Sequence, residues 1–423
     1  MEKYDDVDVY QLSTEEIDPS KYFRVIKLPA IDRGFAFSHK GFAHRLYTTG
    51  NMERLDYIHQ YGWFHGAPTH SRMNHQLLAY AFAHLIGNYL HLSAEKRRNL
   101  QCAALTHDVT TGAMGDRVKH IAQSELNEET TYTHWISDRR ILAFFRKENI
   151  NAQSCSDAIR GKDQIGKLLD WLDKIAYTYY DYDQLKQHHP EIYEKLRRRL
   201  QDYIRKFNTP LINTLRVDDV LTRGHRLHIS LVKDHLGDTA CGDIPVFVCF
   251  ALMRAVLFEE VCFSGGTNAM AEFYGCVVAP YLITNNLLTV SDLRYKQDKD
   301  IAQVMADFFA VTQITMEREY FKGEWFFDTE AKAQQKAITE MKAPDVLAFI
   351  MKTSDYGKTC VSMVLRLGVF SNGHIHGLRD NELRTPFIRK AEEDGVKKFR
   401  VISIQGLPYN QEKINKLREF LTK

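Results

Sequence analysis

The predicted fold depends first on residues 100–108, which read Leu-Gln-Cys-Ala-Ala-Leu-Thr-His-Asp. Ala103, Ala104 and His107 recur at the spacing of one helix face, so the pattern predicts a buried helix with an imidazole in an apolar position. His107 and Asp108 are adjacent, and on a helix their side chains diverge by roughly 100°. They can offer one nitrogen and one oxygen ligand to a single ion. For His107 alone, a hydrogen-bonded core histidine is the alternative.

Two more helices with apolar faces are predicted, one on each side of this stretch. The earlier helix carries Leu77, Leu78, Ala81, Leu85 and Tyr89. The later helix carries Leu169, Leu172, Ala176, Tyr177 and Tyr180, with Asp173 on the same face. Burying an unpaired carboxylate is costly, so Asp173 should be protonated, paired in a salt bridge or bound to a metal ion.

His75 stands at the start of the earlier helix, so the three helices together carry four candidate ligands: His75, His107, Asp108 and Asp173. Two imidazoles and two carboxylates suit a divalent Mg, Mn, Fe, Co, Ni or Zn ion rather than a cysteine-rich structural zinc. Such a set leaves positions open for water and a phosphate oxygen, as metal-assisted hydrolysis requires. We therefore predict a divalent metal ion at these four residues, without specifying which.

The overall composition is that of an ordinary globular protein. Apolar residues make up 44% and charged residues 26% of the 423 residues, and 56 Lys and Arg balance 54 Asp and Glu. This balance gives no argument for binding nucleic acid or a membrane, although a local basic patch for nucleic acid remains possible. The seven cysteines are scattered without a CxxC pair, and the acidic first ten residues lack an apolar signal segment. We therefore expect a cytoplasmic protein with reduced thiols.

Several motifs around these residues resemble the HD-domain phosphohydrolases, and most closely the deoxynucleoside triphosphate triphosphohydrolases. That subgroup has an R-L-x-x-I-x-Q-L-G run, then H-[ST]-R-x-x-H, A-A-L-x-H-D and D-K-x-x-Y-x-x-x-D. The matching segments here are Arg54–Gly62, His70–His75, Ala103–Asp108 and Asp173–Asp181. Thr133-His134 is similar to a T-H-E segment of the subgroup, with Trp135 in place of Glu. The resemblance is good over residues 54–182 and weak elsewhere.

The resemblance implies roles for five residues that would contact a nucleotide. Gln60 would contact the sugar, while Arg72 and Lys174 would contact the phosphates. Tyr177 and Asp181 would border the 3′ side of the sugar. The chemistry agrees with these roles, because cations beside a metal ion clamp phosphate and a Tyr–Asp pair can hold a hydroxyl. Arg72 as a surface cation and Tyr177 as a core residue are the alternatives.

The segment after the HD pair departs from the triphosphohydrolases. Those enzymes have two catalytic histidines here, where this chain has Thr111 and Asp116. Gly115-Asp116 is instead similar to the HD 5′-deoxynucleotidases, although the Glu that those enzymes have at the position of Thr111 is missing. Asp116 could orient the attacking water or protonate the leaving oxygen, or it could only cap a helix that begins near Arg117. His134 is the other candidate catalytic residue, on resemblance alone.

The predicted architecture is mostly α: an HD-domain helical core with a small α+β C-terminal lobe. We divide the chain into an irregular N-terminal arm (1–40, with one short strand near Phe23), a metal-binding core (41–200), a helical extension (201–345) and the lobe (346–423). An apolar helical hairpin is expected at 243–288, with its turn at Ser264-Gly265-Gly266, and the clearest strand at Lys398–Ile404.

The predicted function is hydrolysis of a deoxynucleoside triphosphate to deoxynucleoside and triphosphate. A 5′-deoxynucleotidase acting on monophosphates and a non-catalytic nucleotide-binding regulator are the alternatives. By analogy with such relatives we also expect a homo-oligomer.

Overall fold

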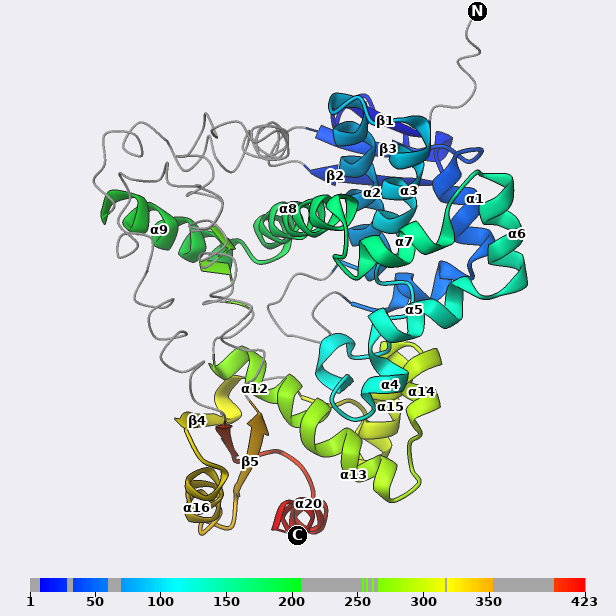
Figure 1. The fold of residues 1–423 in the computed structure, drawn as a ribbon. Coiled ribbons are helices and arrows are strands. Elements are labelled where there is room, and N and C mark those ends of the chain that lie inside the picture. The colour runs from blue at the N-terminus through cyan, green and yellow to red at the C-terminus, as the bar shows by residue number, and fades with distance from the viewer. Residues whose placement is uncertain are drawn as a thin grey trace, which may run out of the picture.

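The protein is mostly helical, with one three-stranded antiparallel sheet near each end of the chain (Figure 1). This computed structural model describes residues 8–28, 33–59, 70–206, 253–254, 256–257, 261, 265–315, 318–352 and 399–422. The predicted fold class, mostly α with a small α+β C-terminal lobe, is confirmed. No helix in these described ranges combines the length and apolar character needed to span a membrane.

The N-terminal sheet has the order β1-β3-β2 and is antiparallel throughout. Its strands are β1 (Val9–Leu12), β2 (Arg24–Leu28) and β3 (Arg33–Phe37). The sheet packs on the helical core, where Phe35 meets Phe82 edge-on with ring centroids 5.7 Å apart. The prediction of an irregular arm was therefore wrong for this segment, although the strand expected near Phe23 is present as β2. Strands this short carry little alternation, and only the sheet partners and the apolar cover stabilise them.

The central core is a group of helices that contains all three predicted apolar faces. Helices α2 and α8 pack against each other, and α3 contacts both of them. Hydroxyl or carboxylate side chains cap all three at their N-termini, at Ser71, Ser93 and Asp163. The elements of this core are α1 (Phe42–Thr49), η4 (Met52–Tyr57), α2 (Arg72–Tyr89), α3 (Ala94–Thr106), η5 (Gly115–Val118), α4 (Gln123–Leu126), α5 (Glu128–Ile136), α6 (Arg139–Lys147), α7 (Ala152–Ile159), α8 (Gln164–His188) and α9 (Pro190–Lys206).

A second group of helices lies below this core in the view of Figure 1. It consists of α12 (Gly265–Phe273), the π-helical η7 (Tyr274–Val278), α13 (Ala279–Thr284), α14 (Val290–Tyr295) and α15 (Asp298–Phe309). The first three follow one another without a break, and Gly265 begins α12. Most of the first arm of the predicted hairpin, and Ser264 in its turn, lie outside the described residues. A Cβ at Gly275 would meet the Arg117 backbone oxygen at 3.2 Å, so glycine allows this helix to approach η5 closely.

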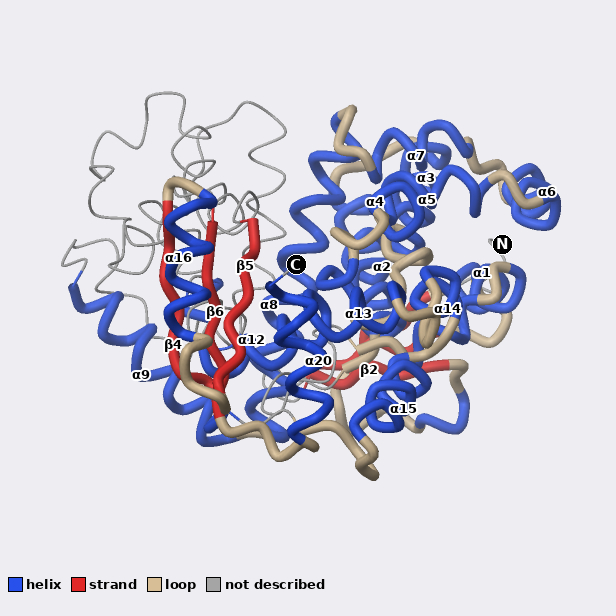
Figure 2. The backbone as a smooth tube through the Cα atoms, turned by 90° about the horizontal axis from the view of Figure 1, so that it is seen from below, coloured by secondary structure: helices blue, strands red, loops and turns tan. Residues whose placement is uncertain are grey.

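The C-terminal lobe is a sheet covered by a helix on one face and by the second helical group on the other. The strands have the order β4-β6-β5, and α16 lies across one face of them (Figure 2). The elements are β4 (Phe321–Phe327), α16 (Glu330–Glu340), β5 (Val346–Lys352), β6 (Phe399–Gln405) and α20 (Gln411–Thr422). The predicted strand at 398–404 is confirmed as β6. The lobe also includes β4, which we had placed in the helical extension, so a boundary at 346 divides the sheet.

Candidate metal centre

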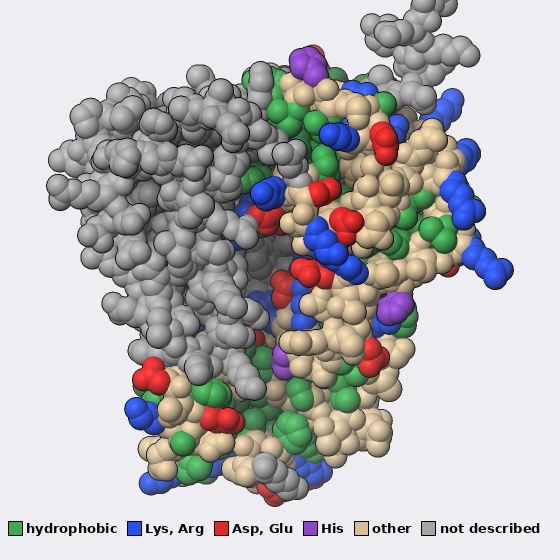
Figure 3. All heavy atoms as spheres, in the orientation of Figure 1, with side chains coloured by type: hydrophobic (Ala, Val, Ile, Leu, Met, Phe, Trp, Pro, Cys, Tyr) green, Lys and Arg blue, Asp and Glu red, His purple; other side chains and the backbone are tan. Residues whose placement is uncertain are grey.

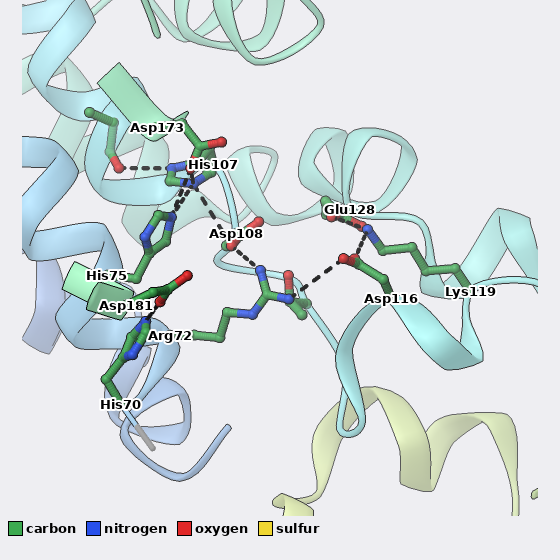
Figure 4. A network of polar contacts seen from close by, with 12 residues as sticks. His70, Arg72, His75, His107, Asp108, Asp116, Lys119, Glu128, Asp173 and Asp181 are labelled. Atoms are coloured by element: carbon green, nitrogen blue, oxygen red, sulfur yellow. Dashed lines mark hydrogen bonds and ion pairs between the residues drawn. The ribbon is translucent and has the colours of Figure 1, made fainter. Parts of the chain in front are cut away.

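Three helices bring the four predicted metal ligands together. His75 lies in the first turn of α2, His107 is the C-cap of α3 with Asp108 directly after it, and Asp173 lies in the middle of α8. The His75 Nε2 is 2.8 Å from Asp173 Oδ1 and 3.3 Å from His107 Nε2 (Figure 4). The His107 Nε2 is 3.3 Å from Asp173 Oδ1 and 3.8 Å from Asp108 Oδ2.

The spacing of these atoms fits a single ion. Two nitrogens that each bind a metal at about 2.1 Å lie roughly 3 to 3.4 Å apart in tetrahedral or octahedral geometry, and the two Nε2 atoms are 3.3 Å apart. Ligand atoms of His75, His107 and Asp108 all lie within 4.8 Å of one another. The Nδ1 of His107 is 2.9 Å from the Ala104 carbonyl oxygen, an outer contact that aims Nε2 at the centre. These residues could hold a metal ion.

The charges at the centre are tightly linked. Burial alone would lower the pKa of His107, but Asp108 and Asp173 raise it to about 9. Burial would raise the pKa of the Asp173 carboxyl, but hydrogen bonds from His107 and His75 hold it well below its usual value. The carboxylate that the sequence placed on an apolar face is partly buried, and it is paired with two imidazoles. The salt-bridge alternative and the metal site involve the same atoms, because the nitrogens and oxygens that pair with one another here are those that would bind an ion.

Arg72 lies directly against this centre rather than at the surface. It is the first residue of α2, only 5% of it is exposed, and its Nη1 donates to Asp108 Oδ2. Its other terminal nitrogen, Nη2, is 3.9 Å from Asp116 Oδ2. Burial would lower the pKa of the guanidinium, but the charges of Asp108 and Asp116 outweigh burial and raise this pKa above its usual value. The surface-cation alternative for Arg72 is therefore wrong.

Asp116 begins a second ion-pair group on the outer side of Arg72. It lies inside η5, whose N-cap position is Met114, so the capping alternative for Asp116 is wrong. Its Oδ1 is 2.5 Å from Lys119 Nζ, and Lys119 also pairs with Glu128 on α5. The positive charges of Lys119, first, and of Arg72 lower the pKa of Asp116. An ionised Asp116 can accept a hydrogen bond from water, but it cannot supply a proton.

Two of the predicted nucleotide contacts on α8, Lys174 and Tyr177, lie around the same centre. The Tyr177 ring is 6.2 Å from the His75 ring between centroids, and the Lys174 ammonium pairs with Asp170. Burial lowers the pKa of Lys174. The Arg254 guanidinium lies 4.7 Å from the centroid of the Tyr177 ring, and Arg254 is only 6% exposed.

Three predicted site residues are not joined to this centre by the described contacts. Asp181 is fully buried, with Oδ1 3.3 Å from Nε2 of the equally buried His70, whose pKa burial lowers well below its usual value. His134 is exposed on α5 and takes part in none of the ion pairs described above. Gln60 lies outside the described residues.

The segment that carries Asp116 is fastened to the second helical group. The Ala113 N–H donates to the Leu293 carbonyl at 2.7 Å. Asp298, at the start of α15, accepts from the backbone N–H of Met114 and from that of His59, each at 2.8 Å. Residues some 180 positions further along the chain therefore set the position of the segment that follows the HD pair.

This face of the molecule is hollowed, and Lys, Arg, Asp and Glu side chains gather on the described side of the hollow (Figure 3). A separate pocket of about 420 Å³ lies between η4 and α15, next to His59, and none of the predicted site residues that the structure describes lines it.

Sequence reasoning did not single out Lys119, Glu128 and Arg254 as site residues. Glu128 follows Asn127, the N-cap of α5, so in the sequence it resembles an ordinary acidic residue in a first helical turn. Lys119 is one cation among many on a charged segment. Arg254 lies in an apolar stretch, and an arginine interrupting such a stretch is the one signal that could have identified it.

Comparison with known proteins shows the fold only. No protein-family model and no curated protein matches the chain. The solved structure of a hypothetical protein from Aquifex aeolicus is similar, with a TM-score of 0.53 and 13% identity over 94% of this chain and 99% of that chain. A phosphohydrolase from Bacteroides thetaiotaomicron VPI-5482 has a TM-score of 0.44 and 12% identity over 90% of this chain and 99% of its own. Likeness as distant as the second carries no argument about activity.

Proposed function

We propose that this protein is an HD-type, metal-dependent phosphohydrolase that converts a deoxynucleoside triphosphate into deoxynucleoside and triphosphate. The observation that carries the proposal is the convergence of His75, His107, Asp108 and Asp173 from three helices onto one point. A purely structural role would not require ligand atoms of His75, His107 and Asp108 to lie within 4.8 Å of one another, with Asp173 against both imidazoles. Arg72, which by its position in the motif would contact phosphate, donates to Asp108 at the same point.

These four residues would hold the ion, which when bound would lower the pKa of a water molecule and neutralise charge on a phosphate oxygen. Arg72 is oriented by Asp108, and a guanidinium held in this way binds phosphate oxygens with little loss of side-chain entropy. Arg254 lies over the ring of Tyr177, and Lys174, whose pKa the Arg254 charge helps to lower, adds positive charge on the α8 side. Asp116 would accept a hydrogen bond from the attacking water and so orient it toward phosphorus.

A 5′-deoxynucleotidase is the second candidate, and one observation favours it. Arg72, Lys119 and Lys174 are each already paired with a carboxylate of the protein. Cations compensated in this way suit a monophosphate better than the larger negative charge of a triphosphate. The triphosphate reading rests on the wider set of motifs that Gln60, Arg72, Lys174, Tyr177 and Asp181 belong to. The non-catalytic regulator remains the third candidate.

Product analysis by chromatography tests the proposal. The purified protein is incubated with each dNTP, NTP, dNMP and NMP in Mg²⁺, Mn²⁺ or Co²⁺. Asp173→Asn serves as the site variant, since it leaves the Arg72–Asp108 pair intact, and Asp202→Asn on the exposed side of α9 is the matched control. Intact triphosphate released from dNTPs alone, and lost in Asp173→Asn, is the expected result.

Phosphate released only from monophosphates would instead select the nucleotidase. Nucleotide binding without any metal-dependent product would select the regulator and overturn the hydrolase proposal. Equal activity in Asp173→Asn and the control would contradict the assignment of the metal centre.

A further inference from the structure

Beyond the metal centre, charges of alternating sign form a continuous chain through the protein (Figure 4). Its members, in spatial order, are Asp108, Arg72, Asp116, Lys119 and Glu128. The first member is a candidate metal ligand and the last begins α5. The chain therefore links the metal centre to a helix that supplies none of the ligands.

Glu128 is largely buried, yet within the described part of the chain only one of its two carboxylate oxygens is paired. Its side chain is only 14% exposed, and Lys119 binds Oε1, whereas Oε2 is buried without a hydrogen-bond partner among the described residues. Burial raises the pKa of Glu128 more than Lys119 lowers it. A half-satisfied buried carboxylate costs stability that a neutral side chain of the same shape would not.

The start of α5 does not require Glu128 either. The Asn127 side chain already caps this helix by accepting from the Glu129 N–H at 2.9 Å. Glu129 occupies the same first turn and is exposed, so it can interact with the helix dipole without being buried. A buried, costly carboxylate that is needed neither for the cap nor for the dipole points to a role in function.

Lys119 is the member through which Glu128 can act on the site. Its ammonium lies between two carboxylates, that of the largely buried Glu128 and that of the exposed Asp116. The Asp116 side chain is 67% exposed, so without Lys119 little would restrict it to the rotamer that faces Arg72. A lysine that is itself held by a buried partner loses less entropy when it fixes Asp116.

We propose that Lys119 and Glu128 are positioning residues for the hydrolytic reaction: Glu128 holds the Lys119 ammonium against Asp116, and Lys119 keeps Asp116 beside Arg72, where it orients the attacking water. This inference rests on the proposed function, since it concerns the same site. It assigns to a Glu–Lys–Asp chain the task that catalytic histidines perform in the resembling triphosphohydrolases.

The test is a double-mutant cycle on the nucleotide that wild-type protein hydrolyses. Glu128→Gln, Asp116→Asn and the double variant are compared for kcat, KM and bound metal, with Glu129→Gln as the matched control in the same helical turn. Glu128→Gln should lower kcat by roughly 10-fold or more, with KM and metal content within about 2-fold of wild type. Glu128→Gln should cause no further loss in the Asp116→Asn background, because both changes disable the same group.

Three results would overturn the inference. Wild-type kcat in Glu128→Gln would remove the role of Glu128 while leaving the proposed function standing. Losses that multiply in the double variant would show that Glu128 does not act through Asp116. A wild-type protein without metal-dependent hydrolysis would remove the proposed function and this inference with it. If Glu128→Gln does not fold, Lys119→Gln breaks the chain one contact nearer to Asp116 and has the same expected result.

Discussion

Replacing Asp298 by alanine should destabilise the protein and weaken its site together. This carboxylate is fully buried and accepts from the backbone N–H groups of His59 and Met114 at 2.8 Å each, with the Nδ1 of His59 a further 3.1 Å contact. Asp298→Ala leaves the buried Met114 N–H and the partly buried His59 N–H without this acceptor. Hydrogen bonds to a charged acceptor contribute about 1.5 to 3 kcal/mol each, so the expected loss is at least about 3 kcal/mol.

Urea unfolding followed by tryptophan fluorescence measures this loss. The matched control is Asp307→Ala on the same helix, where the carboxylate is exposed and, within the described ranges, accepts from Gln303 alone. This change should stay within about 0.5 kcal/mol. Because Met114 directly precedes η5, hydrolytic activity should also fall in folded Asp298→Ala below the midpoint of unfolding. Equal stability of the two variants would refute the claim that Asp298 fastens the segment carrying Asp116 to the second helical group.

Three further outcomes are expected. Asp173→Asn should weaken the binding of Mn²⁺, measured by calorimetric titration, by more than about 100-fold. Mutating a residue that only hydrogen-bonds to a ligand changes metal affinity by about 100-fold at most. Binding within about 3-fold of wild type would contradict the role of Asp173 as a ligand. Gly112→Ala should lower the urea midpoint of unfolding, because the alanine Cβ would lie 2.7 Å from the Leu293 carbonyl oxygen. An unchanged midpoint would show that the backbone at Leu293 can move away without loss of stability. Burial raises the pKa of Glu128, so its protonation favours the folded state. That contribution is complete below the usual glutamate pKa of about 4.3 and is lost as pH rises through the higher folded value. Urea midpoints of Glu128→Gln should therefore fall less than those of wild type from pH 4 to pH 7, and parallel curves would contradict the raised pKa.

The sequence pointed to the four candidate metal ligands because helical periodicity places residues on a face. Once Leu172 and Ala176 are assigned to a buried face, Asp173 must lie on it, and the same argument applies to His107. The pairing of these residues across three helices needed more than periodicity, and here the motif resemblance supplied the missing link. The structure brings the four residues together as this combination predicted.

The contacts that organise the surroundings of the site could not be predicted in the same way. Glu128 reaches Lys119 across a turn and a short helix, and Asp298 reaches Met114 from 184 positions further along the chain. Such pairs leave no periodic signal, since each partner is an ordinary charged residue in its own segment. The N-terminal sheet was missed for a related reason: β1 has four residues and β2 and β3 have five, and strand pairing stabilises them more than their own sequences do.

Anomalous X-ray diffraction from crystals grown with Mn²⁺ tests the central claim most directly. The account predicts one strong peak at about 2 to 2.3 Å from Nε2 of His75, Nε2 of His107 and carboxylate oxygens of Asp108 and Asp173. It also predicts that this peak is absent in Asp173→Asn crystals prepared in the same way. No peak among these four residues in the wild-type protein, or a strong peak elsewhere with these residues still hydrogen-bonded only to one another, would contradict it.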